Sequence, residues 1–185
     1  IIWRDQGFDG LVILNRIMGH EISSVDNGDV IVKLASGGDW DEMVQWSVEN
    51  KLSRIEQLSW IPGRVGATPV QNVGAYGKEI ADTLVSIRAY DIQKKGFVDI
   101  PKSECKFGYR TSRFKTSDKG RFIISAITLK LSKKYATPPF YASLQSYLDE
   151  NNITEYTPEN IRRGVIAIRS KKLPDPDIVA NNGSF

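Results

Sequence analysis

The residues from 59 to 80, SWIPGRVGATPVQNVGAYGKEI, combine unusual backbone freedom with amide chemistry. Glycine loses more conformational entropy on folding than any other residue, and a missing side chain adds nothing to a core. A glycine cluster therefore indicates positive φ angles and backbone amides that no side chain covers. Successive free amides bind anions, typically the pyrophosphate of a dinucleotide, although a flexible surface loop explains the segment equally well. The glycines concerned are Gly63, Gly66, Gly74 and Gly77.

Other reactive side chains are scarce. Gln71 and Asn72 carry amide donors and acceptors suited to the edge of a heterocyclic ring. His20 and Cys105 are the only histidine and cysteine, so they cannot supply a zinc cluster. Neither a G-x-S-x-G nor a G-x-x-x-x-G-K-[ST] motif occurs. A role for His20 as a lone catalytic base is less favoured than the ordinary interpretation, a histidine at the surface or half-buried. The chemistry is therefore expected from a cofactor or from residues outside this chain.

The elements before and after the glycine-rich segment are mainly strands. The β-branched run at residues 30–34 predicts a strand, followed by a tight turn and a helix that Asp39 caps and that ends near Asn50. Alternation at residues 83–92 predicts a half-buried strand, and residues 122–131 predict another. The side chains expected to face inward are Val85, Ile87 and Ala89 in the first, and Ile123, Ile127, Leu129 and Leu131 in the second.

The last third of the chain is helical. A short face of Tyr141, Leu144 and Leu148 predicts one helix, which ends at residues 151–152. Thr157 then caps a second helix that has Pro158 at its first position. Its buried side is expected to hold Ile161, Val165 and Ile168, and the segment LPDP at 173–176 marks a break. The fold class predicted from these elements is α+β.

Bulk properties narrow the function further. With 185 residues, 41% of them hydrophobic, the chain suits one sizeable domain. A net charge of +3 fits a phosphorylated ligand, but the basic residues are scattered among 22 acidic ones, which argues against nucleic acid. Cys105 alone excludes an internal disulfide, and no apolar run is long enough to span a membrane. The chain lacks an initiator methionine and ends on ANNGSF, so we expect both ends to be cuts inside a longer protein.

Four segments in order resemble the UDP-N-acetylenolpyruvoylglucosamine reductase family, also called UDP-N-acetylmuramate dehydrogenases. They are DQGFDGLVILNR at 5–16, IPGRVGATPVQNVGAYGKEI at 61–80, CKFGYRTSRFK at 105–115 and KKLPDPDIVANNGSF at 171–185. A fifth, FYASLQSYL at 140–148, is similar to a substrate-contacting segment of one subtype of that family. The resemblance thus extends over nearly the whole chain.

The resemblance implies a flavin-binding fold of the vanillyl-alcohol-oxidase (PCMH) type. Residues 1–173 would be the FAD-binding domain without its first phosphate-loop lobe, and residues 174–185 the start of a substrate-binding domain. The implied reaction uses FAD and NADPH to reduce UDP-N-acetylglucosamine enolpyruvate to UDP-N-acetylmuramate for bacterial peptidoglycan. We expect a monomeric cytoplasmic protein with no nucleic-acid or membrane partner and no metal. We also expect this chain to be inactive alone, because a catalytic glutamate of the family lies beyond its last residue.

The matching motifs also assign roles to single residues. Arg110 corresponds to the arginine that stabilises charge on the substrate carboxylate, and Ser184 to the proton donor. Tyr141 and Lys172 correspond to substrate-binding residues. The cofactor-binding residues implied by the glycine-rich motif are Gly63, Val65, Gly66, Pro69, Gln71, Asn72, Gly74, Ala75, Tyr76 and Gly77.

Alternatives remain open at this stage. Another flavoprotein oxidoreductase of the same fold, such as an alcohol or sugar oxidase, often attaches its flavin through histidine or cysteine, and His20 and Cys105 do not match such motifs. A non-catalytic FAD- or nucleotide-binding fragment is the second alternative. Trp60 and Arg64 depart from the small residues of many relatives: Trp60 would pack on a flavin or fill a gap, and Arg64 would aid phosphate binding.

Overall fold

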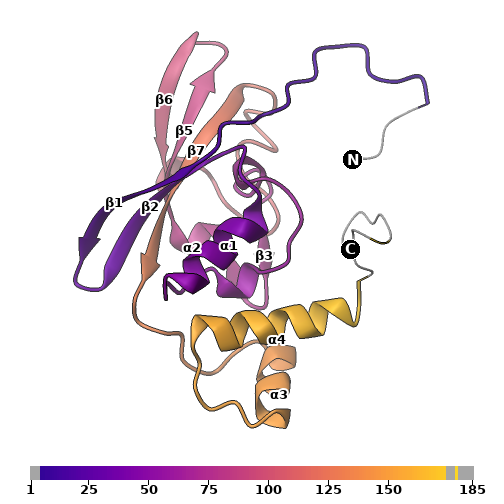
Figure 1. Cartoon of the computed structure of the whole chain (residues 1–185). Coiled ribbons are helices and arrows are strands. Elements are labelled where there is room, and N and C mark those ends of the chain that lie inside the picture. Colours follow the sequence, from indigo (N-terminus) through magenta and orange to yellow (C-terminus); the bar gives the residue numbers. More distant parts are fainter. Residues whose placement is uncertain (1–4, 174–177, 179–185) are drawn as a thin grey trace.

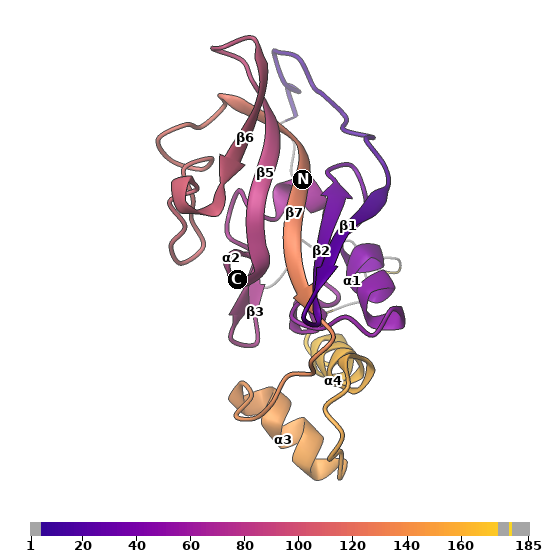
Figure 2. The same ribbon diagram turned by 90° about the vertical axis from the view of Figure 1, so that its left-hand side faces the viewer.

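A five-stranded antiparallel sheet forms the centre of the molecule. The computed structural model describes residues 5–173 and residue 178. The strands lie in the order β1, β2, β7, β5, β6, and Figures 1 and 2 show the sheet edge-on and face-on. Their bounds are His20–Asp26 for β1, Asp29–Ala35 for β2, Leu84–Asp91 for β5, Gly96–Pro101 for β6 and Phe122–Ser132 for β7.

One face of the sheet carries the main core. Helix α1 (Trp40–Glu49) and the short helices η1 (Glu56–Leu58), η2 (Val65–Ala67) and α2 (Ile80–Thr83) contribute to that core. Trp40 is fully buried, and its indole Nε1 donates a hydrogen bond to the Leu58 carbonyl at 2.9 Å. The central strands contribute Val32, Leu34, Ile87, Ile127, Leu129 and Leu131, all buried.

A second, smaller core lies between the last two helices. Helix α3 (Ala142–Glu150) and helix α4 (Pro158–Ser170) bury Leu144, Leu148, Ile161 and Val165 against each other. In both views this helix pair lies beyond one end of the sheet, with α4 between α3 and the main body. Thr157 caps α4 as predicted, because its hydroxyl accepts a hydrogen bond from the Asn160 amide at 3.2 Å.

Most predicted elements are confirmed, but two inward-facing assignments are wrong. A register shift between Leu84 and Ser86 leaves Val85 40% exposed and puts Leu84 in the core. A second shift pairs Arg88 with Ala126 and Ala89 with Ile124, so Ile124 is buried and Ile123 is not. Each bulge inserts one residue, which moves every side chain beyond it to the other face.

Two strands and one side-chain position were missed. Strands β1 and β6 lie at the sheet edges, where exposed positions weaken the alternation that indicates a strand. Tyr141 does not share the buried face of α3: it precedes the helix as its N-cap residue and is 56% exposed. The cap position turns its side chain away from the small core, and its ring instead meets Tyr76 edge-on at 5.9 Å.

A chain of ion pairs closes the long loop between β6 and β7. Asp91, at the end of β5 and almost completely buried, accepts hydrogen bonds from Arg121 Nε and Nη2, the latter at 2.7 Å. Arg121 also reaches Asp118, which accepts from Arg113 Nε at 2.6 Å. The Arg121 guanidinium is the main reason that the pKa of Asp91 is lowered to about 2.

This network predicts a specific pH dependence of stability. Because the folded-state pKa of Asp91 is depressed, its contribution is present above the unfolded value of about 3.9 and is lost as pH falls toward about 2. Arg121→Met should therefore lower the free energy of unfolding at pH 7 and flatten its decrease between pH 5 and pH 2. Urea unfolding at several pH values measures this.

Lys119→Met is the matched control, because Lys119 is an exposed cation of the same loop. It should keep the pH profile of the unsubstituted chain. Equal pH profiles for the Arg121 and Lys119 variants would show that the Asp91 pair does not stabilise the fold.

Candidate functional site

The glycine-rich segment is hydrogen-bonded to the rest of the fold and is not a loose surface loop. The Val65 amide donates to the Gly38 carbonyl at 3.0 Å, and the Gly66 amide to the Ser36 carbonyl at 2.9 Å. Both carbonyls belong to the predicted turn between β2 and α1. A Cβ on Gly66 would lie 2.6 Å from the Ser36 Cβ, so only glycine permits this approach.

The expected run of free amides is not observed in the first half of this segment. The amides of Val65, Gly66, Ala67 and Thr68 all donate to protein carbonyls, and so do those of Val70, Asn72 and Val73. Buried backbone donors pair within the protein whenever a short helical turn offers acceptors, and η2 offers them. The interpretation of residues 65–68 as an anion-binding concavity of uncovered amides is therefore wrong.

The second half of the segment is a hairpin. Strands β3 (Gly74–Ala75) and β4 (Lys78–Glu79) pair antiparallel across a two-residue turn. Tyr76 and Gly77 form that turn with φ of 49° and 77°, the pattern of a tight hairpin turn. The Gln57 side chain donates to the Tyr76 carbonyl at 3.1 Å from behind, which fixes the turn to η1.

Arg110 crosses this hairpin. Its Nη2 donates to the Gly74 carbonyl at 2.6 Å, and its Nη1 lies 3.5 Å from the Glu79 carboxylate. A Cβ on Gly74 would collide with the Arg110 guanidinium and lie 2.8 Å from the Lys78 carbonyl oxygen. Arg110 itself has a φ of 52°, so its backbone is also in the left-handed region.

Asn72 holds the arginine loop in place. Its Nδ2 donates to the Gly108 carbonyl at 2.9 Å and to the Glu79 carboxylate at 2.7 Å, and its Oδ1 accepts from the Ala81 amide. The side chain is almost fully buried. Its amide therefore supports the loop that carries Arg110, and it does not face a ligand ring as the sequence suggested.

A cleft of about 510 Å³ brings the predicted substrate residues together. Arg110, Tyr141 and Lys172 all line it, although they are far apart in the sequence. Tyr76 and Gly77, at the hairpin turn, line it too. Its charged lining has four cations and one carboxylate: Lys78, Arg110, Arg169 and Lys172 with Glu79. This excess of positive charge suits an anionic ligand.

Arg169 is a residue that the sequence analysis missed. It lies in the last turn of α4, and the Lys172 amide, just beyond the helix, donates to its carbonyl at 2.9 Å, so both residues reach the same cleft. Its Nε donates to the Trp60 carbonyl at 3.1 Å. Burial lowers the pKa of Arg169, and burial raises the pKa of Tyr76, while the neighbouring Arg169 opposes that rise.

A second groove of about 460 Å³ lies on the other side of the segment. Gly66, Ala67 and Val70 line it together with Ser36 and Arg64. The opposite wall is apolar and aromatic, with Ile13, Leu14, Phe114, Phe122 and Ile124. The lining also includes the Asp118 carboxylate, which is paired with Arg113 and Arg121. Apolar side chains together with the Arg64 guanidinium fit a ring system that carries a phosphate. Arg64 thus has a position that fits phosphate binding.

The remaining predicted cofactor residues divide into two groups. Val65 and Pro69 are buried and shape the segment from within. Gly63, with a φ of 127° and open space at its Cβ position, and Gln71 are exposed. Ser184 lies outside the described residues, as does the predicted boundary at residue 174.

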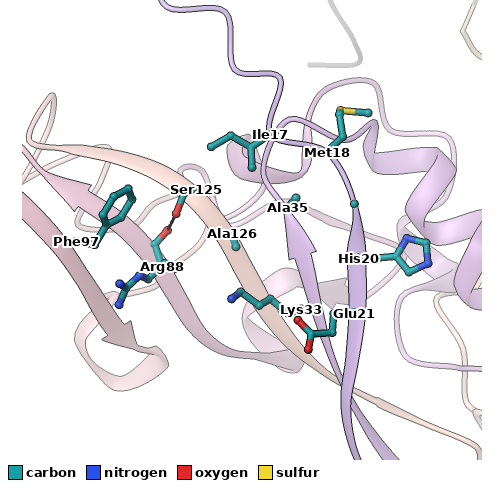
Figure 3. A pocket seen from close by; sticks show the side chains of 11 residues that line it. Ile17, Met18, His20, Glu21, Lys33, Ala35, Arg88, Phe97, Ser125 and Ala126 are labelled. Carbon is teal, nitrogen blue, oxygen red and sulfur yellow. Dashed lines mark hydrogen bonds between the residues drawn. The ribbon is translucent and has the colours of Figure 1, made fainter.

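Another pocket, of about 590 Å³, lies elsewhere. Figure 3 shows it on the face of the sheet opposite the main core, with Lys33, Arg88 and Phe97 projecting from the strands. Its lining includes His20, which is the weak candidate base, but none of the predicted catalytic, cofactor-binding or substrate-binding residues. The His20 ring packs at 4.3 Å from the Trp46 ring, which accounts for it as a half-exposed aromatic contact.

Comparison with known proteins shows which family the chain belongs to. The FAD binding domain family matches residues 2–96. The chain belongs to the FAD binding domain family. It is 42% identical over 178 residues to the UDP-N-acetylenolpyruvoylglucosamine reductase of Aliivibrio fischeri and 43% identical over 178 residues to that of Flavobacterium johnsoniae. These matches cover 96% of this chain and 50% and 53% of the relatives.

A solved structure shows the same fold. The UDP-N-acetylenolpyruvylglucosamine reductase of Thermus caldophilus superposes with a TM-score of 0.53 at 24% identity, covering 77% of this chain and 44% of the other. The chain thus spans about half the length of the curated relatives it matches. The resemblance seen in the motifs, the flavin-binding α+β fold and FAD as the cofactor are confirmed.

Within residues 5–173, no helix has the length and apolarity needed to cross a membrane. Over the same described part of the chain, no group of three or more histidine, cysteine or acidic side chains is arranged to hold a metal ion.

The position of Gly74 gives a testable prediction. Gly74→Ala should destabilise the chain by about 1–3 kcal/mol, because the added methyl group overpacks the site and must displace the Arg110 guanidinium or the β4 backbone. Gly96→Ala is the control, since its Cβ would meet nothing closer than 3.9 Å. Thermal unfolding of both variants measures the difference. Equal melting temperatures would mean that Arg110 does not need the space at Gly74.

Proposed function

We propose that this chain is the central part of a flavin-dependent reductase that acts on UDP-N-acetylenolpyruvoylglucosamine with NADPH as the reductant. The product would be UDP-N-acetylmuramate, a precursor of bacterial peptidoglycan, made in the cytoplasm. The observation that supports this proposal best is the cleft in which Arg110, Tyr141 and Lys172 meet. These three residues come from separate motifs, and only the folded chain joins them.

The groove lined by Arg64 and Gly66 fits the flavin nucleotide. Its aromatic and aliphatic side chains would pack on a flat ring, and the Arg64 guanidinium would donate hydrogen bonds to a phosphate. When bound and reduced by NADPH, the flavin would supply the hydride that reduces the enolpyruvyl double bond. Gly63, with open space at its Cβ position next to Arg64, would let the cofactor approach the backbone closely.

The cations of the other cleft would bind and orient the substrate. Its carboxylate would accept hydrogen bonds from the Arg110 guanidinium, whose rigid fork of donors matches a planar carboxylate. Reduction of the enolpyruvyl double bond puts negative charge next to that carboxylate, and a fixed guanidinium stabilises it most where water is excluded. Lys172 and Arg169 would hold the diphosphate as the second anionic group.

Proton delivery completes the reaction. Ser184 would donate the proton to the carbon next to the carboxylate, and Tyr141 would contact the substrate from the start of α3. The Asn72 amide positions the Arg110 loop, so it would act through Arg110 rather than on the substrate.

A hybrid protein tests the function. Residues 1–185 would replace the matching segment of the Aliivibrio fischeri relative, because the chain covers half of that protein. The purified hybrid should show flavin absorbance and oxidise NADPH only when the enolpyruvyl nucleotide is present. A hybrid that retains flavin but oxidises NADPH equally with a simple alcohol or sugar would favour the alternative of another flavoprotein oxidoreductase.

The isolated chain tests the second alternative. We expect it to be inactive and to bind FAD weakly. The relatives are about twice as long, and their additional segments would complete the cofactor site and the active site. Tight FAD binding without turnover even in the hybrid would favour a non-catalytic nucleotide-binding role.

The role of Arg110 can be separated from cofactor binding. In the hybrid, Arg110→Ala should slow substrate reduction by about 10²–10³-fold, the usual cost of removing one charge-stabilising donor. NADPH-dependent bleaching of flavin absorbance should change little, because no substrate carboxylate takes part. Stopped-flow absorbance separates the two rates. Lys119→Ala, which removes an exposed cation of the same loop, is the control. Equal slowing of both rates would assign Arg110 to flavin positioning instead.

A further inference from the structure

The backbone of Trp60 is held at both its amide and its carbonyl group. Its amide donates to the Asp41 carboxylate at 2.5 Å, and its carbonyl accepts from Arg169 Nε at 3.1 Å. Trp60 has a φ of 59°, a left-handed conformation that a bulky residue adopts rarely and keeps only when its surroundings impose it. Trp60 is the second residue of the glycine-rich segment.

Asp41 has a second partner on α4. Arg162 donates to both oxygens of the Asp41 carboxylate, at 2.6 and 2.8 Å. The Arg162 side chain is 12% exposed and that of Asp41 24%, so the pair is partly shielded from water. Bidentate arginine–carboxylate pairs fix geometry as well as adding attraction.

These contacts join two units that have separate cores. The helix pair α3–α4 buries its own apolar side chains, and the main body buries another set. The joint between the units includes the Asp41–Arg162 pair and the Arg169–Trp60 hydrogen bond. Polar joints of this kind permit relative motion unless specific contacts fix them.

Both sides of the joint reach the cationic cleft of the candidate site. Arg169 lines it from α4 and Lys172 from the turn that follows α4, and Tyr76 and Gly77 line it from the hairpin of the main body. Asp41 and Arg162 do not line the cleft, so any effect of theirs on a ligand must act through other residues.

We propose that Asp41 and Arg162 are positioning residues that hold the Trp60 backbone in place and thereby set the width of the cationic cleft lined by Arg110, Arg169 and Lys172. Asp41 accepts a hydrogen bond from the Trp60 amide. Through its ion pair with Arg162 it also fixes the position of α4 relative to Trp60. Arg169 on the same helix then meets the Trp60 carbonyl, and its remaining guanidinium nitrogens stay directed at the cleft. The inference rests on the proposed function only for the identity of the anion, a diphosphate.

Hydrogen exchange tests this positioning role without any ligand. The Trp60 amide contacts Asp41 and not Arg169 or Arg162, yet Arg169→Met and Arg162→Met should each speed its exchange about fivefold or more. Asp41→Asn keeps an acceptor for the amide but loses the ion pair, and should have an intermediate effect. Arg163→Met and Glu42→Gln are the controls, because Arg163 and Glu42 are exposed neighbours with the same charges. Amides of β7 monitor whether each variant is folded.

Binding of UDP tests the consequence for the cleft. Arg162→Met should weaken UDP affinity about fivefold, although Arg162 does not touch the cleft, and Arg163→Met should change it less than twofold. Arg162→Lys, which keeps the charge but not the bidentate geometry, should recover part of the affinity. Isothermal titration of the whole chain measures these values.

The outcomes separate the two ideas. If the unsubstituted chain does not bind UDP at millimolar concentration, the proposed diphosphate site of this chain fails, while the exchange data still decide the positioning role. If Trp60 amide exchange in the Arg162 and Arg169 variants equals that of Arg163→Met, the positioning role is overturned, whether or not UDP binds.

Discussion

Close approach of backbone to neighbouring groups is the constraint on which the site depends. Gly66 lies against Ser36, and Gly74 lies beneath the Arg110 guanidinium, in spaces that a single Cβ would fill. These two contacts fix the glycine-rich segment against the β2–α1 turn and against the loop that carries Arg110. The groove on one side and the cleft on the other both take their shape from this fixed segment.

Rigidity at Arg110 comes from several independent contacts. Asn72 holds the Gly108 carbonyl, the Ser112 hydroxyl donates to the Val70 carbonyl at 2.7 Å, and Lys115 donates to the Arg110 carbonyl. Farther along the loop, Arg113 and Asp118 join the pair of Asp91 and Arg121. A guanidinium held by such a frame loses little freedom when it binds a carboxylate, which is the condition for strong electrostatic stabilisation.

The helix pair α3–α4 has a different relation to the site. Its buried apolar side chains pack mainly against each other, with Tyr76 of the hairpin packed against them, and its cleft-lining residues Tyr141, Arg169 and Lys172 lie at or just beyond the helix ends. Burial favours the pair as a unit, whereas polar contacts at Asp41 and Trp60 determine where the unit sits. Stability and site geometry thus depend on different residues of the same helices.

The sequence by itself determined the class of protein and most elements. Cap residues such as Asp39 and Thr157 and the apolar periodicity of α1, α4, β2 and β7 depend on near neighbours in the chain, so they were readable. The ordered motifs identified the flavin family and pointed to Arg110, Tyr141 and Lys172. Only the tertiary structure decided what the glycines do, because their contacts with Ser36 and Arg110 join residues about 30 positions apart.

The same reason explains the errors. The bulges that turned Val85 and Ile123 outward arise from pairing with another strand, which a local pattern does not contain. The amides of residues 65–68 donate to carbonyl groups at η2 and in the β2–α1 turn. They are therefore paired within the protein, where the sequence suggested amides free to bind an anion. Arg169 and Asp41 gained their places only when α4 docked on the main body, since a side chain's partners across a fold depend on packing rather than on its own sequence neighbours.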